Sequence, residues 1–476
     1  MAFGIDFGTT NSATVELVEN WPKTHGGRAG RPYPSLLAID KLTGEVVARG
    51  EAVQKLREED PVTLGQCEII INPKLLLGSD YAKRIGGILW CPKDFVREIF
   101  IGLSEVVKNN QGDFQEAVVA VPVNFAARKR SEIREGANGA GVKISGFISE
   151  PTAAVYKYRD KLDNLRKLAV FDWGGGTLDI ALLDIDPDQK VTELDAVGLE
   201  LGGSHLDKKI ASYLYGPIQK ETGIAWNELS SSQQYAFLAN CETAKIRLSR
   251  EKNSAFTIPN FSPGYHAQGK LERAELDALL QTEKEKAAGA LQALLKKNGL
   301  LWNDIGSIIM VGGSSQLYGM REYLEEISEG CTVLAPGEDS DWAVAHGAAL
   351  LSENPGSYII SGNIGLRLAD GNLFPLYQDG DVIQPGENSD ERKLNFGIVE
   401  DTQTAVFKFA RWHDAANVED IGFALAKCNG FVDEAMTLSW GISSELEFQA
   451  TIESSFAGEP QEKTFHYDNV LFRYAF

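Results

Sequence analysis

The strongest constraint on this chain is a short motif that occurs twice. Residues 169–179 read AVFDWGGGTLD, an apolar strand followed by a carboxylate, a glycine turn, a threonine and a second carboxylate. Residues 5–9 read IDFGT and repeat the order of apolar residue, carboxylate, aromatic residue, glycine and threonine. This echo predicts two similar lobes, each of which presents one turn to a shared cleft. Two unrelated hairpins with permissive turns are the alternative interpretation.

The residue types in both turns suit phosphate binding through a cation. The glycines at 174–176 have no Cβ atoms, so their backbone N–H groups can come close to a bulky anion. A carboxylate at such a turn would repel a bare phosphate, so Asp6 and Asp172 are expected to face a cation. Mg²⁺ takes few carboxylates and keeps several waters, which fits this role. The threonines of both turns would donate hydroxyl groups to phosphate oxygens.

Further segments carry candidate chemistry. Lys74 is flanked by apolar residues and is either a solvated surface charge or a cation near a terminal phosphate. Glu150 precedes Pro151 at an expected helix start, where it would complement the helix dipole or orient a water for attack on phosphate. Glycine turns at 202–203 and 312–313 each lead into an expected helix.

Periodicity places a domain boundary near residue 355. The 476 residues are enough for two or three domains. Beyond residue 355, segments such as 446–453 alternate apolar and polar side chains, as on a half-buried antiparallel strand, and 404–412 and 463–472 are further strand candidates. We therefore expect an α/β domain at 1–354, a linker at 355–361 and an all-β domain at 362–476.

Composition excludes several functional classes. The formal net charge of −21 argues against a nucleic-acid or anionic-membrane surface, because both need clustered Lys and Arg. No apolar run is long enough to span a membrane, and no signal peptide precedes the first expected strand. The five scattered cysteines offer no zinc ligand set and predict reduced thiols in the cytoplasm.

Taken in order, these motifs resemble those of the actin-like ATPase superfamily, and most closely the seventy-kilodalton heat-shock chaperone family. The matching segments read GIDFGTTNS from residue 4, EPTAA from 150, FDWGGGTLD from 171 and VGGSS from 311. They cover residues 1–350, and the all-β domain matches the family's peptide-binding sandwich more loosely. The resemblance implies a two-lobed actin-like ATPase domain with duplicated ribonuclease H-like lobes, followed by a β sandwich.

The resemblance also implies a role for each matching residue. The catalytic set is Lys74 for charge developing at the γ-phosphate, Glu150 near the attacking water, Asp172 and Thr177. Asp6 and Asp172 would arrange magnesium with its waters, and Asp179 would bind a monovalent cation such as K⁺. The residues expected to contact ATP or ADP are Gly8, Thr9, Thr10, Asn11, Gly174, Gly175, Gly176, Thr177, Gly202, Gly203, Glu242, Lys245, Ile246, Ser249, Gly312, Gly313, Ser314 and Gln316. In the β domain, Phe396, Val399 and Val406 would line a hydrophobic pocket for an extended peptide.

The sequence therefore predicts an ATP-dependent molecular chaperone, in which hydrolysis is coupled to the binding of unfolded or extended peptides. A nucleotide-exchange factor and a J-domain co-chaperone are the partners that the resemblance implies. An actin-fold small-molecule kinase, a nucleotide-gated filament, and a family member that has lost peptide binding are the alternatives.

A few positions depart from the family's pattern. Gln316 replaces an arginine that covers adenine, which predicts weaker nucleotide binding. Ser204-His205 replaces two acidic residues, and Gly146 replaces an arginine that engages J-domain co-chaperones. Residues 358–361 lack the family's acidic, leucine-rich linker signature. Because no lid segment follows the β domain, we expect a lidless or truncated, divergent member of the bacterial type, with fast peptide exchange.

Overall fold

The computed structural model shows two compact units. The first comprises residues Met1–Val123 and Glu132–Pro355, and the second comprises Asn124–Ser131 and Gly356–Phe476. No feature of the sequence predicted that the segment at 124–131 would join the second unit. The structure describes residues 2–27, 30–123, 125–158, 167–186, 191–328, 330–334, 337, 340–353, 356–383, 392–397, 403–413, 417–431 and 434–475.

Two sheets of the first unit share one strand order. Within this unit the order is β11-β10-β1-β2-β3 in the first sheet and β18-β17-β12-β13-β14 in the second. In each, an antiparallel run of three strands continues into two parallel strands. The first sheet contains β1 (Ala2–Asp6), β2 (Asn11–Val18), β3 (Trp21–Thr24), β10 (Glu116–Val121) and β11 (Lys143–Ser149), with β4 (Tyr33–Pro34) also pairing with β2. The second contains β12 (Lys167–Trp173), β13 (Leu178–Ile185), β14 (Val191–Leu199), β17 (Ser307–Val311) and β18 (Thr332–Leu334).

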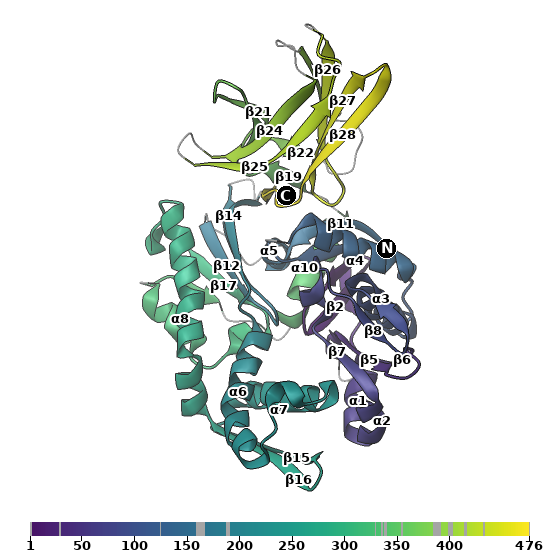
Figure 1. Cartoon of the computed structure of the whole chain (residues 1–476). Helices are drawn as coiled ribbons and strands as arrows, with labels where there is room; N and C mark the ends of the chain where they lie inside the picture. Colours follow the sequence, from purple (N-terminus) through teal and green to yellow (C-terminus); the bar gives the residue numbers. More distant parts are fainter. Residues whose placement is uncertain are drawn as a thin grey trace. The chain divides into compact units, whose positions relative to one another are not determined.

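The central strands of the second sheet are buried on both faces. Every residue of β12 after Lys167 is buried, and Asp184 is the one residue of β13 that is partly accessible. Strands covered on both faces read as continuous apolar runs, which is the sequence pattern of this region. Helix α8 (Arg273–Lys297) lies along this sheet (Figure 1), and its Leu280, Leu291 and Leu294 belong to the same core as Phe171.

Helices and smaller sheets surround these two sheets. The remaining helices are α1 (Glu51–Glu59), α2 (Pro61–Gln66), α3 (Pro92–Asn109), α4 (Ala127–Gly139), α5 (Glu150–Tyr158), α6 (Gly203–Thr222), α7 (Ser231–Leu248), α9 (Met320–Ile327) and α10 (Ser340–Glu353). One small sheet contains β5 (Leu36–Asp40), β6 (Val46–Arg49) and β7 (Cys67–Ile71), and two hairpins pair β8 (Lys83–Ile85) with β9 (Ile88–Trp90) and β15 (Asn253–Ser262) with β16 (Tyr265–Glu272). Among the described helices, none combines the length and apolar composition needed to cross a bilayer.

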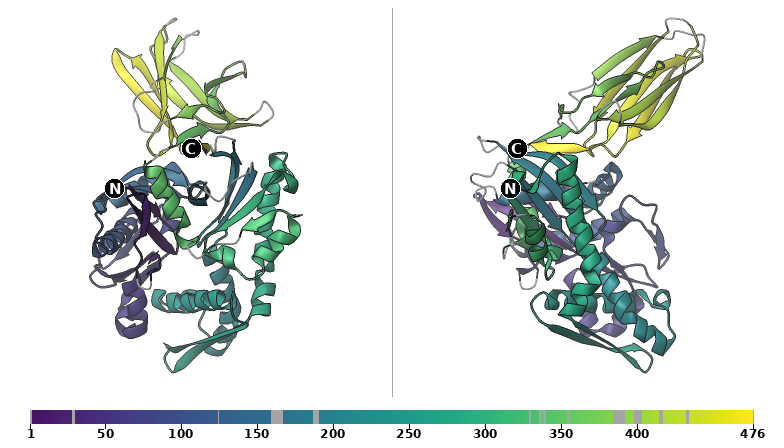
Figure 2. Two further views of the ribbon diagram at one scale, coloured as in Figure 1. Left: turned by 180° about the vertical axis from the view of Figure 1, so that it is seen from behind. Right: turned by 90° about the vertical axis from the view of Figure 1, so that its left-hand side faces the viewer.

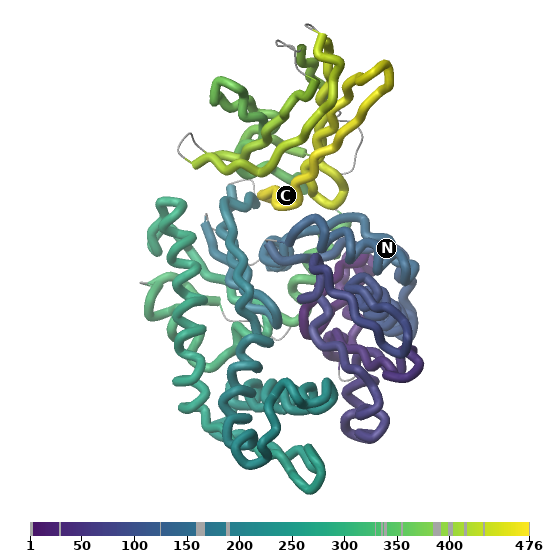
Figure 3. The backbone as a smooth tube through the Cα atoms, viewed as in Figure 1, coloured from purple at the N-terminus to yellow at the C-terminus, as the bar shows by residue number. Residues whose placement is uncertain are grey.

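Helix α10 packs closely on the first sheet and on α5. It comes late in the sequence of the unit, yet it lies beside β1 and β2, as the tube in Figure 3 shows. Small residues permit this approach: a Cβ atom on Gly4 of β1 would lie 2.1 Å from the carbonyl oxygen of Ala345. A Cβ atom on Gly347 would lie 1.7 Å from the carbonyl oxygen of Ala153 in α5.

We expect Gly347→Ala to destabilise the first unit, because the added methyl group would meet backbone rather than a flexible side chain. Overpacking of this kind costs about 1–3 kcal/mol, and more where backbone must shift. The midpoint of urea unfolding measures the effect. Gly289→Ala is the matched control, because residue 289 lies in α8 with nothing within 4 Å of its added Cβ. That variant should be more stable by up to about 1 kcal/mol. A Gly347→Ala midpoint as high as that of the control would contradict the close packing.

The second unit consists of strands apart from the short segment at 125–131. One sheet has the order β21-β20-β24-β25 and another has the order β23-β26-β27-β28, and Figure 2 shows the two sheets side by side. Between them, Phe409 of β24 stacks on Phe465 of β28 with 4.3 Å between ring centroids. The strands are β20 (Asn363–Arg367), β21 (Leu373–Tyr377), β23 (Arg392–Gly397), β24 (Thr404–Trp412), β25 (Val418–Lys427), β26 (Ala435–Ile442), β27 (Phe448–Phe456) and β28 (Glu459–Tyr467).

The segment expected to be a linker is a strand in the structure. β19 (Ser357–Ile360) pairs with β29 (Phe472–Ala475) and with β22 (Val382–Ile383). Tyr358 packs edge-on against Tyr474, and the Tyr474 hydroxyl accepts a hydrogen bond from the Gly356 N–H at 2.6 Å. The expected linker at 355–361 thus contains a paired strand over Ser357–Ile360. Aromatic side chains on both strands pack against each other, since Tyr358 contacts Phe472 as well as Tyr474.

Candidate functional site

The two echoed turns face each other in the first unit. The turn at 174–176 joins β12 to β13, and the Gly174 N–H donates to the carbonyl oxygen of Thr177 at 3.0 Å. A Cβ atom on Gly175 would lie 2.4 Å from Thr10 Oγ1, and one on Gly176 would lie 2.1 Å from Thr9 Oγ1. Glycine is therefore required where the turn of one sheet meets the turn of the other. Each turn joins two antiparallel strands, as in the interpretation of two unrelated hairpins. The two hairpins nevertheless contact each other in space.

The other two glycine turns converge on the same place. The N–H groups of Gly203 and Ser204 donate to the carbonyl oxygens of Gly174 and Gly175, at 3.0 and 2.7 Å. The Ser314 hydroxyl donates to the same Gly174 carbonyl at 2.8 Å. Gly312 has a φ of 80°, and a Cβ atom there would lie 2.6 Å from Asp172 Oδ1. Turns that are far apart in the sequence thus form one continuous glycine-lined surface.

Lys74 and Glu150 form a buried ion pair. Lys74 lies in a short 3₁₀ helix (Pro73–Leu76), and its Nζ donates to Glu150 Oε1 at 2.7 Å. The two residues are 5% and 8% exposed, so Lys74 is not a solvated surface charge. Glu150 begins α5 and holds Lys74 as well, so dipole complementarity is not its whole role. Sequence position alone could not reveal a pair whose members are 76 residues apart.

Buried carboxylates around this pair have raised pKa values. The pKa of Asp6 is raised from 3.8 to about 7, first by burial and then by the charge of Glu150, while Lys74 partly opposes the shift. Burial and Glu150 likewise raise the pKa of Asp179 to about 7. The pKa of Asp172 is raised well above its ordinary value by burial, Glu150, Asp6 and Asp179. When these carboxyls are ionised, the site therefore carries more negative charge than its one lysine compensates.

This charge excess fits a bound cation. Asp179 Oδ1 accepts the Val123 N–H at 2.8 Å, whereas its buried Oδ2 has no hydrogen-bond partner among the described residues. No cluster of three His, Cys, Asp or Glu side chains that could bind a metal directly occurs in the described parts of the chain. Mg²⁺ is often bound by only one or two carboxylates and keeps several of its waters. The donor set thus suits a hydrated Mg²⁺ near Asp6 and Asp172, and a cation at the unpartnered oxygen of Asp179.

The residues expected around adenosine lie on α7 and the turn at 312–316. Lys245 Nζ is 2.8 Å from Asp207 Oδ1 and also donates to the Gly203 carbonyl oxygen at 3.3 Å. Burial raises the pKa of Glu242, one helical turn before Lys245. Ile246 is 59% exposed, and Gln316 is also exposed, so both are accessible to a ligand. Asp207 was missed by the sequence analysis, although its position four residues after Gly203 on the expected helix was a usable signal.

Phe396 and Val406, two of the residues expected in the peptide pocket, lie on strands of different sheets. Phe396 is on β23, half-buried, and its ring packs edge-on against Phe407 at 5.4 Å. Val406 is on β24 and 53% exposed, whereas its neighbour Phe407 is buried. Alternate residues of a strand point to opposite faces, so Val406 faces away from the side on which Phe396 packs. Val399 lies outside the described residues.

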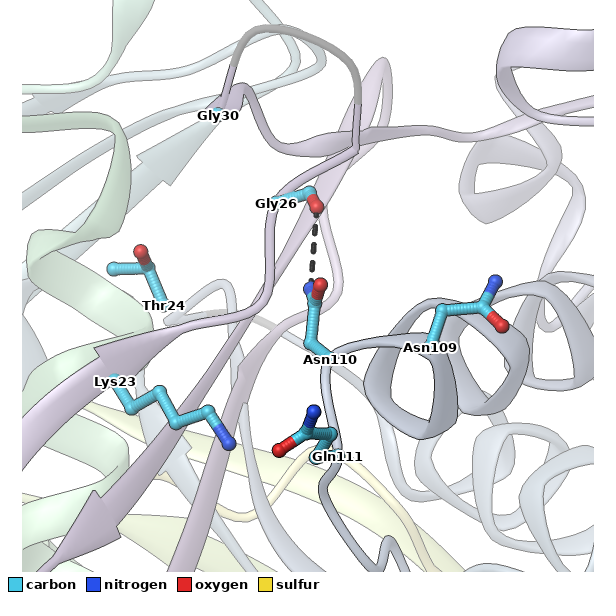
Figure 4. A pocket seen from close by; sticks show the side chains of 7 residues that line it. All are labelled: Lys23, Thr24, Gly26, Gly30, Asn109, Asn110 and Gln111. Carbon is cyan, nitrogen blue, oxygen red and sulfur yellow. Dashed lines mark hydrogen bonds between the residues drawn. The ribbon is translucent and has the colours of Figure 1, made fainter.

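A separate pocket of about 470 Å³ lies elsewhere in the first unit. It is lined by Lys23, Thr24, Gly26, Gly30, Asn109, Asn110 and Gln111. Figure 4 shows the Asn110 side chain, whose amide donates to the Gly26 carbonyl oxygen at 3.4 Å. None of the residues expected to act in catalysis or binding lines this pocket.

The first unit contains two sheets with the same strand order, glycine turns that meet between them, and a buried Lys–Glu pair. This arrangement is the one expected of an actin-like nucleotide-binding protein. The family comparison agrees: the family model described as Hsp70 protein matches residues 81–363, more than half of the chain. The protein belongs to the Hsp70 family, which confirms the resemblance found in the sequence. Members of this family are ATPases with an actin-like nucleotide-binding domain, and they act as chaperones.

Proposed function

We propose that this protein hydrolyses ATP between two actin-like lobes and couples hydrolysis to the binding of extended, apolar peptides in its β sandwich. The observation that carries the proposal is that the expected glycine turns meet one another, while Asp6 and Asp172 beside these turns feel the charges of the buried Lys74–Glu150 pair. Each lobe contains one of the two sheets, and their common strand order supports a duplicated, ribonuclease H-like origin.

The phosphates of ATP would bind along the glycine-lined surface. Backbone N–H groups near residues 8–11 and 174–177, together with the Thr9, Thr10 and Thr177 hydroxyls, would hydrogen-bond to phosphate oxygens. Lys74 would donate to the oxygen on which charge develops as the γ-phosphoryl group departs. Glu150, held by Lys74, would orient the attacking water. Asp6 and Asp172 would orient the waters of Mg²⁺, and a bound Mg²⁺ would neutralise charge on the phosphates.

The nucleoside would extend toward α7. Glu242 and Lys245 would contact the adenosine and Ile246 would cover one face of adenine, with Ser249, Gly313, Ser314 and Gln316 completing the pocket. The ion pair with Asp207 fixes the position of the Lys245 side chain. Because Gln316 has no planar cation to stack on adenine, weaker nucleotide binding remains part of the proposal. Asp179 would bind a monovalent cation such as K⁺.

The chaperone part of the proposal rests on family membership and on the β sandwich. Unfolded or extended peptides are the proposed substrates, with Val406 on the accessible face of its sheet. A nucleotide-exchange factor and a J-domain co-chaperone are proposed partners, although Gly146 offers no side chain for the latter. A reducing, cytoplasmic location is part of the proposal, because the five cysteines are scattered along the sequence.

We expect the affinity for an unfolded apolar peptide to differ at least about fivefold between the ATP-bound and ADP-bound protein, the lower range of allosteric coupling. Fluorescence anisotropy of a labelled peptide, with steady-state ATPase assays alongside, measures the coupling. A Gly/Ser peptide of equal length is the control and should neither bind nor change the ATPase rate. Equal affinities in both states would favour a member that has lost peptide coupling. Phosphate transfer to a sugar in a substrate panel would favour the kinase alternative.

A further inference from the structure

Glu193 of β14 is a buried carboxylate that none of the sequence motifs includes. It is 2% exposed, although strand β14 is otherwise mostly half-buried. Its Oε2 accepts a hydrogen bond from Thr152 Oγ1 at 2.5 Å and lies 3.1 Å from Ser149 Oγ. An ionised carboxylate is costly to bury unless hydrogen bonds compensate it, and the two hydroxyl groups contribute to that compensation.

The two hydroxyl groups lie where β11 ends and α5 begins. Ser149 is the last residue of β11 and precedes the helix, and its Oγ accepts the Thr152 N–H at 3.4 Å, in the manner of an N-terminal cap. The two side-chain oxygens are themselves 2.6 Å apart. Glu193 therefore stabilises the cap from outside the helix. Its strand belongs to the second sheet, so the carboxylate also ties that sheet to the end of β11 in the first.

Glu150 lies between the two anchored residues. The hydroxyl groups of Ser149 and Thr152 hold the backbone on either side of Glu150. The Glu150 carboxylate accepts a hydrogen bond from Lys74 instead. A catalytic group works only if its position is fixed to within a fraction of an ångström, and a displacement of about 1 Å can cost on the order of a hundredfold in rate. The backbone beneath Glu150 is held in part by a residue 43 positions later in the chain.

We propose that Glu193 is a positioning residue for ATP hydrolysis: it fixes the first turn of α5 and thereby the carboxylate of Glu150. This inference rests on the proposed function, because Glu150 acts on the attacking water only if the protein hydrolyses ATP. Glu193 itself does not contact Lys74 or Glu150 in any hydrogen bond of the described residues, so its effect on the rate is indirect.

The test compares Glu193→Ala, Glu193→Gln and Asp195→Ala in the full chain. Glu193→Ala should lower kcat roughly ten- to hundredfold, with KM for ATP and the ADP affinity little changed, because the nucleoside pocket is separate. Glu193→Gln should recover most of the activity, because a carboxamide oxygen still accepts the Thr152 hydroxyl. Asp195→Ala removes an acid from the same strand, where Asp195 pairs with Lys297 at 2.8 Å, and should leave kcat unchanged.

Thr152→Val provides a second readout. Combined with Glu193→Ala it should add little further loss, because both changes break one interaction. A normal kcat in Glu193→Ala would overturn the inference. So would a result in which kcat and ADP binding both fall only in proportion to the fraction of folded protein. Hydrogen exchange over residues 150–154 separates the two proposals. Faster exchange in Glu193→Ala, but not in Asp195→Ala, supports the role of Glu193 in fixing α5 even if the wild-type protein is no ATPase. Unchanged exchange in Glu193→Ala overturns that role.

Discussion

Lys74→Ala is expected to reduce kcat for ATP hydrolysis by about 10²–10³-fold while ATP still binds. The Lys74 ammonium group is buried and acts on Asp6 and Asp172 beside the proposed phosphate turns. In such a site a fixed charge stabilises a developing negative charge far better than one in water does. Single-turnover ATPase assays measure the chemical step, and titration with ADP measures binding. A variant that hydrolyses ATP at the wild-type rate would remove Lys74 from the mechanism.

Lys83→Ala is the matched control for this variant. Lys83 also forms a short ion pair, 2.6 Å from Glu68, but its side chain is 43% accessible and lies outside the site. Its removal should change neither kcat nor stability by more than a small amount. Lys74→Ala leaves Glu150 without its buried counter-charge, so some loss of stability is expected as well. Thermal unfolding of both variants, with kcat referred to the folded fraction, separates the two effects.

Asp6→Asn is expected to make the nucleotide-free protein more stable and the enzyme inactive. The pKa of Asp6 is raised from 3.8 to about 7, chiefly by burial and by Glu150. The folded state therefore binds this proton more tightly than the unfolded state, so its contribution to stability is full below pH 3.8 and is lost as the pH rises through about 7. At pH 8 the wild-type protein contains the repelling charge, and the asparagine variant does not.

Thermal unfolding at pH 6 and pH 8 measures this effect. At pH 8 the Asp6→Asn variant should unfold at a temperature a few degrees above that of the wild type. Its unfolding temperature should also change less between pH 6 and pH 8 than that of the wild type. Asp40→Asn is the control, because hydrogen bonds from Thr43 and Leu42 lower the pKa of Asp40, so it does not titrate between those pH values. Asp6→Asn should also abolish Mg²⁺-dependent hydrolysis. A less stable variant at pH 8 would contradict the repulsive carboxylate cluster.

Much of the first unit could be predicted from local patterns. The strand, glycine turn and threonine around residue 174 specify a hairpin through backbone sterics alone, and the echo at residues 5–9 predicted a second one. The echo and the resemblance predicted two similar lobes, but local patterns could not give the order of their strands. Strands such as β12 are buried on both faces, and their apolar runs carry no information on their neighbours.

The β domain was harder to predict at the level of its site. Alternation identified strands near 404–412 and 446–453, and β24 and β27 lie there. Which face of each strand would be covered depends on the partner sheet. Phe396 and Val406 therefore point to different sides, although the resemblance placed them in one pocket. The strand at Ser357–Ile360 was missed because its partner β29 comes more than a hundred residues later.

The sequence by itself determined the chemistry of each turn, since glycine freedom, carboxylate charge and threonine hydroxyl groups act within a few residues. It also determined the family, because the order of these motifs along the chain is preserved. Only the tertiary structure decided which groups meet: Lys74 with Glu150, Lys245 with Asp207, and Glu193 with Thr152. Each of these contacts joins segments that are distant in the sequence, and their pairing follows from how the sheets and helices pack rather than from any local pattern.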